Sequence, residues 1–349
     1  MNFSSDNAAG IAPEILAALA AANDGRAMAY GNDAVSERLA VALADCFETK
    51  LAAFPVATGT AANALALATL SPPWGLIYCH RHAHVEEDEA GAPEFFSAGA
   101  KLHLLDGDHG KFDAGTLAGA LATAGVGVEH HPQPAAVTVT QATESGTCYG
   151  PDEIAAIAQV THDHGLKLHV DGARFANAVA FLGCSPADLT WRAGVDVLSF
   201  GATKNGAMAA EAVVFFDPDL AGEMRFRRKR AGHLFSKMRF LSAQLEAYLA
   251  DDAWLRYARH ANACARALAE GLAALPGAGL VHPVEANEVF IRLPEPVIAG
   301  MQADGVLFHP WAPDGPGAVR LVTAFDTDPA DVDAAIAVAR RHAGAAQPT

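Results

Sequence analysis

The chain has 349 residues, of which 51% are hydrophobic and 18% are charged, and its formal net charge is −16. This length is typical of roughly two domains, and this balance is typical of a globular protein with a large core. The negative charge argues against nucleic acid or an anionic membrane surface as a partner.

The cysteines and the N-terminus indicate the compartment. The five cysteines are widely spaced and include no C-x-x-C pair, which favours reduced thiols in a cytoplasmic protein. The first residues lack the pattern of a secretory signal, and no apolar stretch reaches membrane-spanning length without a polar interruption. We therefore expect neither export nor a membrane anchor.

Helical and strand patterns alternate through the first two-thirds of the chain. Helices are expected over residues 13–22, 33–49, 61–70, 113–124 and 151–164, and strands over 76–79, 101–105, 135–140, 168–171, 195–198 and 212–216. Strands that alternate with helices predict a mostly parallel sheet with both faces covered, which is the α/β class. Ligands of such sheets bind at the carboxyl ends of the strands.

The third predicted helix begins at a possible anion site. Thr58, Gly59 and Thr60 precede its alanine-rich run. A glycine at a loop-to-helix junction leaves backbone N–H groups and the positive end of the helix dipole free to bind an anion. The same residues are also common as simple helix caps.

A histidine-rich segment follows the strand predicted at 76–79. His80, His82 and His84 alternate, and the acidic run 86–89 comes next. We expect no metal site, because no second ligand cluster with zinc-type spacing is present and the acidic run is typical of a solvated helix start. One of these histidines could stack on a flat cofactor ring; otherwise they are exposed loop residues.

Two predicted strands end in residues of opposite charge. One runs into Asp171, Gly172 and Arg174, and the other runs through Ser199 to Lys204. A lysine amine and a carboxylate at one sheet edge can hold the two ends of pyridoxal 5'-phosphate. The amine bonds to its aldehyde as a Schiff base, and the carboxylate holds the pyridinium proton. Asp171 could also be a helix N-cap, and Lys204 a surface residue.

The pattern changes near residue 217. Helices are expected over 219–229, 236–250, 253–275 and 329–342, with strands over 288–293, 305–309 and 319–323. We predict a large cofactor-binding domain of residues 1–276 and a small α+β domain of residues 277–349. The basic cluster at 225–230 is either a solvated helix face or a surface that faces a phosphate.

Several motifs together resemble one family. They are Ser5-Asp6-Asn7, Tyr30-Gly31-Asn32-Asp33, Thr58-Gly59-Thr60-Ala61-Ala62-Asn63, Ala83-His84 with Glu89-Ala90-Gly91, His169-Val170-Asp171-Gly172-Ala173-Arg174, Lys204, and Arg320-Leu321-Val322-Thr323. Over nearly its whole length the chain resembles the low-specificity L-threonine aldolases, in the β-eliminating lyase branch of fold type I pyridoxal-phosphate enzymes. The resemblance implies cleavage of β-hydroxy-α-amino acids to glycine and an aldehyde.

The resemblance also implies roles for individual residues. Lys204 carries the cofactor, Asp171 holds the ring nitrogen, and His84 stacks on the ring and assists the proton transfer. Gly59 and Thr60 bind the phosphate. The substrate carboxylate is expected at Arg174 and Arg320, since a guanidinium group can bind a carboxylate through two hydrogen bonds. Arg174 is also expected to contact the cofactor, and Ser5 and Tyr30 lie in the substrate site.

The chain departs from the family at two places. Glu144 stands where a histidine is common, so Glu144 is a candidate for the base that takes the hydroxyl proton, or for a group that orients His84 or a water. The segment after Lys229 lacks the usual glycine run, and Lys229 and Lys237 are candidates to reach the phosphate of a neighbouring subunit. The resemblance implies a homodimer or homotetramer with active sites at the subunit interface.

Three alternatives stay open from the sequence. One is another fold type I activity, such as an aminotransferase or a different β-eliminating lyase. The second is a nucleotide-binding α/β protein without pyridoxal phosphate, against which the missing G-x-G-x-x-G and G-x-x-x-x-G-K-[ST] elements speak. The third is a pyridoxal-phosphate-binding protein without turnover.

Overall fold

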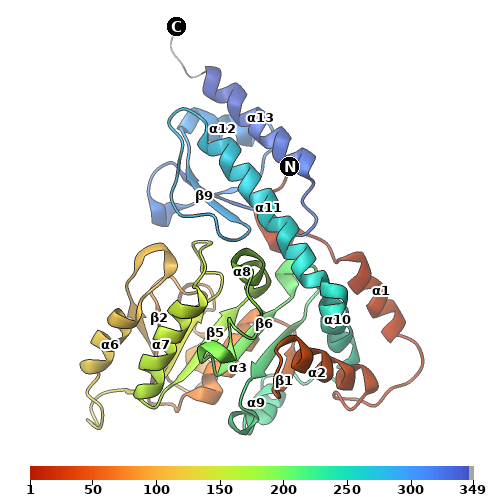
Figure 1. Ribbon diagram of the computed structural model, residues 1–349, viewed down its shortest axis with the longest axis vertical. Helices are drawn as coiled ribbons and strands as arrows, with labels where there is room; N and C mark the ends of the chain where they lie inside the picture. The colour runs from red at the N-terminus through yellow and green to blue at the C-terminus, as the bar shows by residue number, and fades with distance from the viewer. Residues whose placement is uncertain (346–349) are drawn as a thin grey trace.

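The computed structural model describes residues 1–345 and contains two sheets. A seven-stranded sheet has the order β1-β7-β6-β5-β4-β2-β3, and a four-stranded sheet has the order β10-β11-β9-β8. In the large sheet only β7 runs antiparallel to its neighbours. The small sheet is antiparallel throughout. The predicted mostly parallel α/β architecture is therefore confirmed (Figure 1).

The elements have the following bounds. The strands are β1 (Ala52–Val56), β2 (Gly75–His80), β3 (Lys101–Leu105), β4 (Gln133–Thr140), β5 (Lys167–Gly172), β6 (Val197–Gly201), β7 (Glu211–Phe215), β8 (Gly279–Leu280), β9 (Glu288–Arg292), β10 (His309–Pro310) and β11 (Ala318–Val322). The helices are α1 (Pro13–Ala22), α2 (Ala34–Cys46), α3 (Gly59–Leu70), α4 (His84–Glu87), α5 (Ala92–Phe96), α6 (Ala114–Ala122), α7 (Pro151–Asp163), α8 (Phe175–Leu182), α9 (Met224–Arg230), α10 (Arg239–Leu249), α11 (Ala253–Ala273), α12 (Glu295–Ala303) and α13 (Pro329–Ala345). Short 3-10 helices include η1 (Asp6–Ala8), η4 (Thr203–Asn205) and η5 (Pro218–Ala221).

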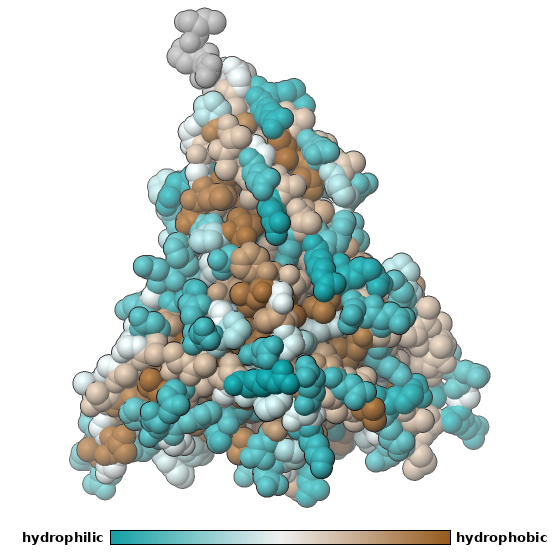
Figure 2. All heavy atoms as spheres, viewed as in Figure 1, coloured by the Kyte–Doolittle hydropathy of each residue, from teal (hydrophilic) through white to brown (hydrophobic). Residues whose placement is uncertain are grey.

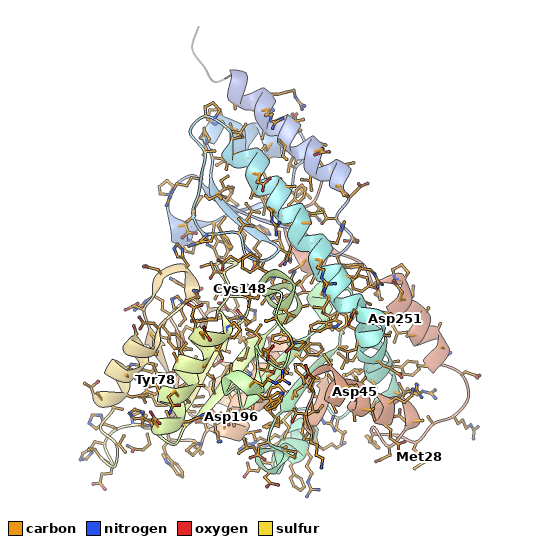
Figure 3. All side chains as sticks on the ribbon, in the orientation of Figure 1. Met28, Asp45, Tyr78, Cys148, Asp196 and Asp251 are labelled. Atoms are coloured by element: carbon orange, nitrogen blue, oxygen red, sulfur yellow. The ribbon has the colours of Figure 1, made fainter. Side chains whose placement is uncertain are left out.

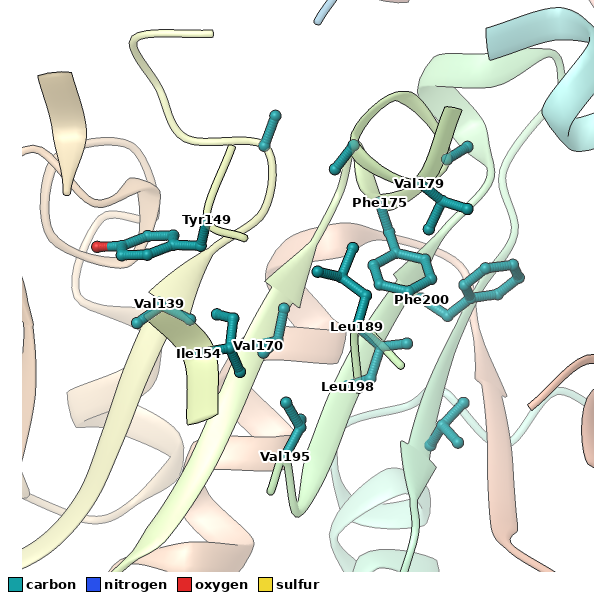
Figure 4. Packing of buried hydrophobic residues seen from close by; sticks show 14 of the residues in the cluster. Val139, Tyr149, Ile154, Val170, Phe175, Val179, Leu189, Val195, Leu198 and Phe200 are labelled. Atoms are coloured by element: carbon teal, nitrogen blue, oxygen red, sulfur yellow. The ribbon is translucent and has the colours of Figure 1, made fainter. Parts of the chain in front are cut away.

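Both faces of the large sheet are buried, because successive residues of a strand point to opposite faces. Leu198 joins the core beneath α7, α8 and α10, whereas its neighbour Val197 joins the core shared with α3 and α9. Figure 4 shows Phe175 and Phe200 close together in the first core, where their ring centroids lie 6.2 Å apart. This two-sided burial explains why the strands read as continuous apolar runs.

The small sheet packs against the second half of α11 and against α12 and α13 (Figure 1). Phe3 joins this core, and its backbone bonds to Leu307 and Val322. The predicted boundary at residue 276 stays a prediction, since α11 contributes to both cores. Cys148, which Figure 3 labels below the small sheet, donates its backbone N–H to the Glu285 carboxylate at 2.8 Å and so links the two units.

Several sequence-based predictions differ from the structure. The strand expected over 305–309 is reduced to β10, because Val306 bonds back to Met301 in the turn that ends α12. The helix expected over 219–229 is divided into η5 and α9 around Gly222. The segment that became β1 was not predicted as a strand, since Pro55 obscured its pattern.

The outer surface is mixed in character. Figure 2 shows hydrophilic residues over most of the visible face, with small hydrophobic patches among them. Within residues 1–345, no helix combines the length and the apolar character needed to cross a bilayer. All five cysteines are unpaired thiols.

Candidate active site

A cavity of about 380 Å³ opens where the carboxyl ends of β5 and β6 meet the N-terminus of α3. This volume lies within the range of small-molecule sites. The lining residues are Asn7, Ala57, Thr58, Gly59, Thr60, Asn63, His84, Asp171, Ala173, Thr203, Lys204, Met208, Ala209 and Glu211. The sheet therefore forms its pocket at the edge where the sequence predicts one.

Lys204 and Asp171 both line this cavity. Asp171 lies near the end of β5, opposite Ser199 of β6, and Lys204 lies in the short η4 turn directly after β6. Asp171 is buried, and its carboxylate accepts hydrogen bonds from Asn63 at 2.8 Å and from the backbone N–H of Ala173 at 3.0 Å. It does not cap α8, because Arg174 occupies the N-cap position of that helix.

The first turn of α3 faces the cavity through Gly59 and Thr60. Thr58 caps the helix, since its hydroxyl accepts from the backbone N–H of Ala61 at 3.2 Å. The first turn has no acidic side chain, and a Cβ added at Gly59 would meet no protein atom within 4 Å. The free N–H groups and the open space suit an anion such as a phosphate.

His84 begins α4 at the edge of the cavity. Its Nδ1 lies 2.8 Å from Oε1 of Glu89, whose carboxylate is fully buried. The hydrogen bond to Glu89 raises the pKa of His84, and burial raises the pKa of Glu89. The expectation that residues 86–89 form a solvated run is therefore wrong for Glu89, since the chain turns inward after α4.

Glu144 lies in a small extension of the cavity, together with His84, Asp171, Arg174 and Lys204. Its Oε1 accepts from the backbone N–H of His84 at 2.7 Å. Burial and the charge of Asp171 raise the pKa of Glu144 to about 7. The carboxyl group can therefore gain or lose a proton near neutral pH, which a general base requires.

The two predicted carboxylate-binding arginines meet at one acidic residue. Arg174 forms two hydrogen bonds with Asp6, at 2.8 and 3.1 Å, and its Nη1 lies 3.3 Å from Glu288. Arg320 donates two hydrogen bonds to Glu288, at 3.0 and 2.7 Å. Ser5 caps the η1 turn that carries Asp6. The orientations of both guanidinium groups thus depend on Asp6 and Glu288.

The buried acids and arginines shift one another's pKa values. Burial acts to raise the pKa of Asp6, but the charges of Arg174 and Lys204 hold it below its usual value. Burial works against the charge of Arg174, yet Asp6 and Glu288 raise the pKa of its guanidinium group. Asp6 and Arg174 are therefore both charged, as a buried ion pair joined by two hydrogen bonds.

Comparison with known proteins identifies the family. The sequence profile described as "Beta-eliminating lyase" matches residues 2–296. The chain belongs to the β-eliminating lyase family. It is 51% identical over 327 residues to the low specificity L-threonine aldolase of Pseudomonas aeruginosa, with 93% of each chain covered. A second such aldolase, from Pseudomonas sp., is 47% identical over 95% of this chain and 94% of its own.

The structural comparison agrees with the sequence comparison. A solved threonine aldolase from Leishmania major superposes with a TM-score of 0.90 at 27% identity, over 98% of this chain and 99% of that one. Family and fold together confirm the predicted fold type I architecture and the predicted lyase class, and they make pyridoxal 5'-phosphate the cofactor.

The cavity of this β-eliminating lyase fits that cofactor. It offers a lysine amine, a buried carboxylate for the ring nitrogen, and the N–H groups of a helix N-terminus for the phosphate. Oδ1 of Asn63, which also lines the cavity, is a buried acceptor that lacks a hydrogen-bond partner among the described residues.

Tyr30, Lys229 and Lys237 lie apart from the cavity of this lyase. They line a separate surface pocket next to Ser236, where Lys229 Nζ lies 5.2 Å from the centre of the Tyr30 ring. Within one subunit the structure therefore does not bring these three residues to Lys204. The basic helix α9 beside them is largely solvated, although Arg228 lies across the Phe54 ring.

Five buried polar residues at or near the site had no role predicted from the sequence, although the first three belong to the quoted motifs: Asp6, Asn63, Glu89, Glu211 and Glu288. Asn63 and Glu211 carried a usable signal, because Asn63 interrupts the buried apolar run of α3 and Glu211 begins the otherwise apolar buried strand β7. Glu211 lines the cavity with Lys204 and accepts from the backbone N–H of Ala202 at 2.9 Å. Burial raises its pKa to about 7.

One cluster bears on the predicted absence of a metal. His84, Glu89 and Asp171 each offer a ligand atom, and these atoms lie within 4.8 Å of one another. The amide nitrogen of Asn63 donates to both carboxylates, at 2.8 Å each. Hydrogen-bond donors thus already lie between these acids, and the absence of a metal stays a prediction.

Proposed function

We propose that this protein cleaves L-threonine, L-allo-threonine and related β-hydroxy-α-amino acids to glycine and an aldehyde. The observation that carries the proposal is that Lys204 and Asp171 share one cavity at the N-terminus of α3. The names of the two Pseudomonas relatives support the same activity.

Lys204, Asp171 and the first turn of α3 would hold the cofactor. The Lys204 amine would bind its aldehyde, and the Asp171 carboxylate would accept a charge-assisted hydrogen bond from the ring nitrogen. Gly59 and Thr60 donate backbone N–H groups to the phosphate. Bound pyridoxal 5'-phosphate supplies an electron sink for bond cleavage at the substrate Cα.

His84 and Glu144 would manage the hydroxyl proton of the substrate. The His84 imidazole would cover a face of the cofactor ring, and the Glu144 carboxylate accepts a hydrogen bond from the backbone N–H of His84. A carboxyl group with a pKa of about 7 is half ionised at neutral pH. Glu144 therefore accepts the hydroxyl proton as the Cα–Cβ bond breaks.

Arg174, Arg320 and Ser5 would bind the substrate carboxylate. Arg174 keeps its contact with Asp6, which holds the guanidinium plane in place. Arg320 lies across the Trp311 ring, 5.4 Å from its centre, and keeps its two bonds to Glu288. These fixed planes orient the Cα–Cβ bond of the substrate relative to the cofactor ring.

We further propose a cytoplasmic homodimer or homotetramer with active sites at the subunit interface. The unpaired state of all five cysteines supports a reducing compartment. The surface position of Tyr30, Lys229 and Lys237 supports a role toward a neighbouring subunit, where Lys229 and Lys237 bind the phosphate and Tyr30 contacts the substrate.

The test is product analysis with purified protein loaded with pyridoxal 5'-phosphate. Incubation with L-threonine should yield equal amounts of glycine and acetaldehyde, and L-allo-threonine should give the same products. Lys204→Ala protein is the control and should yield neither. Release of 2-oxobutyrate with ammonia, in place of glycine, would instead indicate an elimination reaction and would contradict the proposal.

A further inference from the structure

Four side chains form one continuous hydrogen-bonded chain from the edge of the cavity to its floor. His84 Nδ1 contacts Glu89, Glu89 accepts from Asn63, and Asn63 also donates to Asp171. All three contacts measure 2.8 Å. Glu89, Asn63 and Asp171 are buried, whereas the His84 side chain is 33% exposed. The chain thus links the surface-facing imidazole to the buried carboxylate expected at the ring nitrogen.

Asn63 is the hydrogen-bond donor that joins Glu89 to Asp171. Its amide nitrogen carries two hydrogens, and each goes to a different carboxylate. Asn63 is also the single polar residue among the buried positions 61–68 of α3. Because burying an amide costs free energy unless it is hydrogen-bonded, a polar residue in this helix is explained by the two acids that it joins.

Glu89 defines the protonation of His84. A carboxylate only accepts hydrogen bonds, so the imidazole must carry its hydrogen on Nδ1. The other nitrogen, Nε2, is then the proton acceptor of the neutral ring. Glu89 Oε1 accepts from both His84 and Asn63, and its rotation would break two buried hydrogen bonds.

We infer that Glu89 and Asn63 are positioning residues, which hold the His84 imidazole with its hydrogen on Nδ1 and link it to the carboxylate of Asp171. Nε2 is thereby kept as the proton acceptor of the ring, in a fixed place relative to the cofactor. This inference rests on the proposed roles of His84 and Asp171. It adds to them Asn63, which lines the cavity, and Glu89, which is buried behind it.

The protein contains a matched control for this inference. His82 and Glu87 have the same spacing in sequence as His84 and Glu89, and the same contact of 2.8 Å between Nδ1 and Oε1. Both side chains of that pair are 45% exposed. Glu87→Gln therefore removes a charge from an equivalent pair outside the site, and Glu89→Gln removes it inside.

The direct test is nitrogen NMR of isotope-labelled histidine in the loaded enzyme, with the His84 signal assigned by its loss in His84→Gln. The unchanged protein should show hydrogen on Nδ1 of His84. In Glu89→Gln the ring should become a mixture of tautomers, whereas Glu87→Gln should leave the His84 signal unchanged. A His84 signal with hydrogen on Nε2 in the unchanged protein would overturn the inference.

Kinetics supply the second readout. Glu89→Gln should lower kcat about ten-fold or more with little change in KM, since an imidazole in the wrong tautomer cannot take part in proton transfer. The pH at which His84 titrates should also fall in this variant. Asp171 and Lys204 face the same ring with opposite effects on its charge and are unchanged in both variants. Glu89→Asp should restore part of kcat if its carboxylate still reaches the ring.

The Asn63 branch is tested through the cofactor. Asn63→Ala should change the absorbance of the bound cofactor and its pH dependence, because Asp171 loses one of its donors. Unchanged spectra in Asn63→Ala, together with Glu89→Gln kinetics equal to those of Glu87→Gln, would overturn the inference while the proposed function stands. If His84→Gln itself leaves turnover and spectra unchanged, the proposed role of His84 fails instead.

Discussion

Two histidine–glutamate pairs lie two residues apart in the sequence and differ only in their surroundings. In both, Nδ1 of the histidine lies 2.8 Å from Oε1 of a glutamate five residues later. The His82–Glu87 pair is 45% exposed on each side, whereas the Glu89 side chain is fully buried beside α3. The two pairs therefore have the same contact distance but differ in their exposure to solvent.

The difference lies in what water does to each pair. An exposed ion pair of this kind contributes between zero and about 1 kcal/mol, because solvent screens it. In the buried pair the hydrogen bond to Glu89 raises the pKa of His84, and Asn63 extends the contact to Asp171. Both pairs have the same spacing in sequence, but only Glu89 is buried beside α3 and joined to Asn63, and we propose that only this pair affects catalysis.

The largest loss of activity is expected when Lys204, the proposed attachment point of the cofactor, is replaced. Lys204→Ala should lower threonine cleavage by at least about a thousand-fold, because the covalent attachment point of the cofactor is lost. Turnover is measured by acetaldehyde release, and cofactor attachment by the visible absorbance of the protein. Retention of an absorbance band that borohydride removes would contradict the assignment of Lys204.

The next largest difference is expected between the kcat values of His84 and His82 variants. His84→Ala should lower kcat about a hundred-fold, the range of a lost acid–base group. His82→Ala should leave kcat within about two-fold, as for most exposed positions remote from the chemistry. The two variants are compared by steady-state kinetics on L-threonine. Equal losses of kcat would show that His84 and His82 do not differ in their contribution to catalysis.

Glu144 differs from Glu87 and Glu89, because it accepts a hydrogen bond from the backbone N–H of His84 and not from an imidazole ring. Burial and the charge of Asp171 raise its pKa to about 7, so its basic form predominates above pH 7 and is lost below. The kcat of the unchanged protein should therefore rise with pH through about 7. Glu144→Gln should lower kcat and remove that dependence. A variant profile that still rises through pH 7 would assign the base elsewhere.

The smallest effects concern stability. Glu87→Ala should change the free energy of unfolding by about 0.5 kcal/mol or less. Glu89→Ala should cost about 1–3 kcal/mol, because it leaves a buried donor of Asn63 and the Nδ1 donor of His84 without their partner. Denaturant unfolding of both variants, each loaded with the cofactor, gives the two values. A Glu87→Ala loss as large as that of Glu89→Ala would show that burial does not set the difference.

Much of the fold could be predicted because the chain alternates apolar strands with amphipathic helices. Strand β3 and the segment that leads to Asp171 were predicted well, since their patterns are continuous. Strand β10 was overestimated because Val306 and Leu307 look like strand residues, although Val306 closes a turn and Leu307 forms a single bridge to Asn2. Their pairing depends on the N-terminus, which is distant in sequence.

Site residues could be predicted from the sequence where they lie at the ends of apolar strands. They could not be predicted where a segment distant in sequence buries them. Asp171 and Lys204 follow apolar strands, and the structure places both at one cavity. Glu89 follows three acidic residues and reads as solvated, yet the chain turns inward and buries it against Asn63. Nothing within residues 86–89 distinguishes Glu89 from Glu87.

The most direct test of the account is to reduce the loaded enzyme with borohydride, digest it and locate the attached cofactor by mass spectrometry. We expect a reduced pyridoxyl phosphate group on the peptide that contains Lys204, and none in Lys204→Ala. Attachment to Lys229, to Lys237 or to no lysine at all would contradict the central claim that Lys204 and Asp171 hold one cofactor between them.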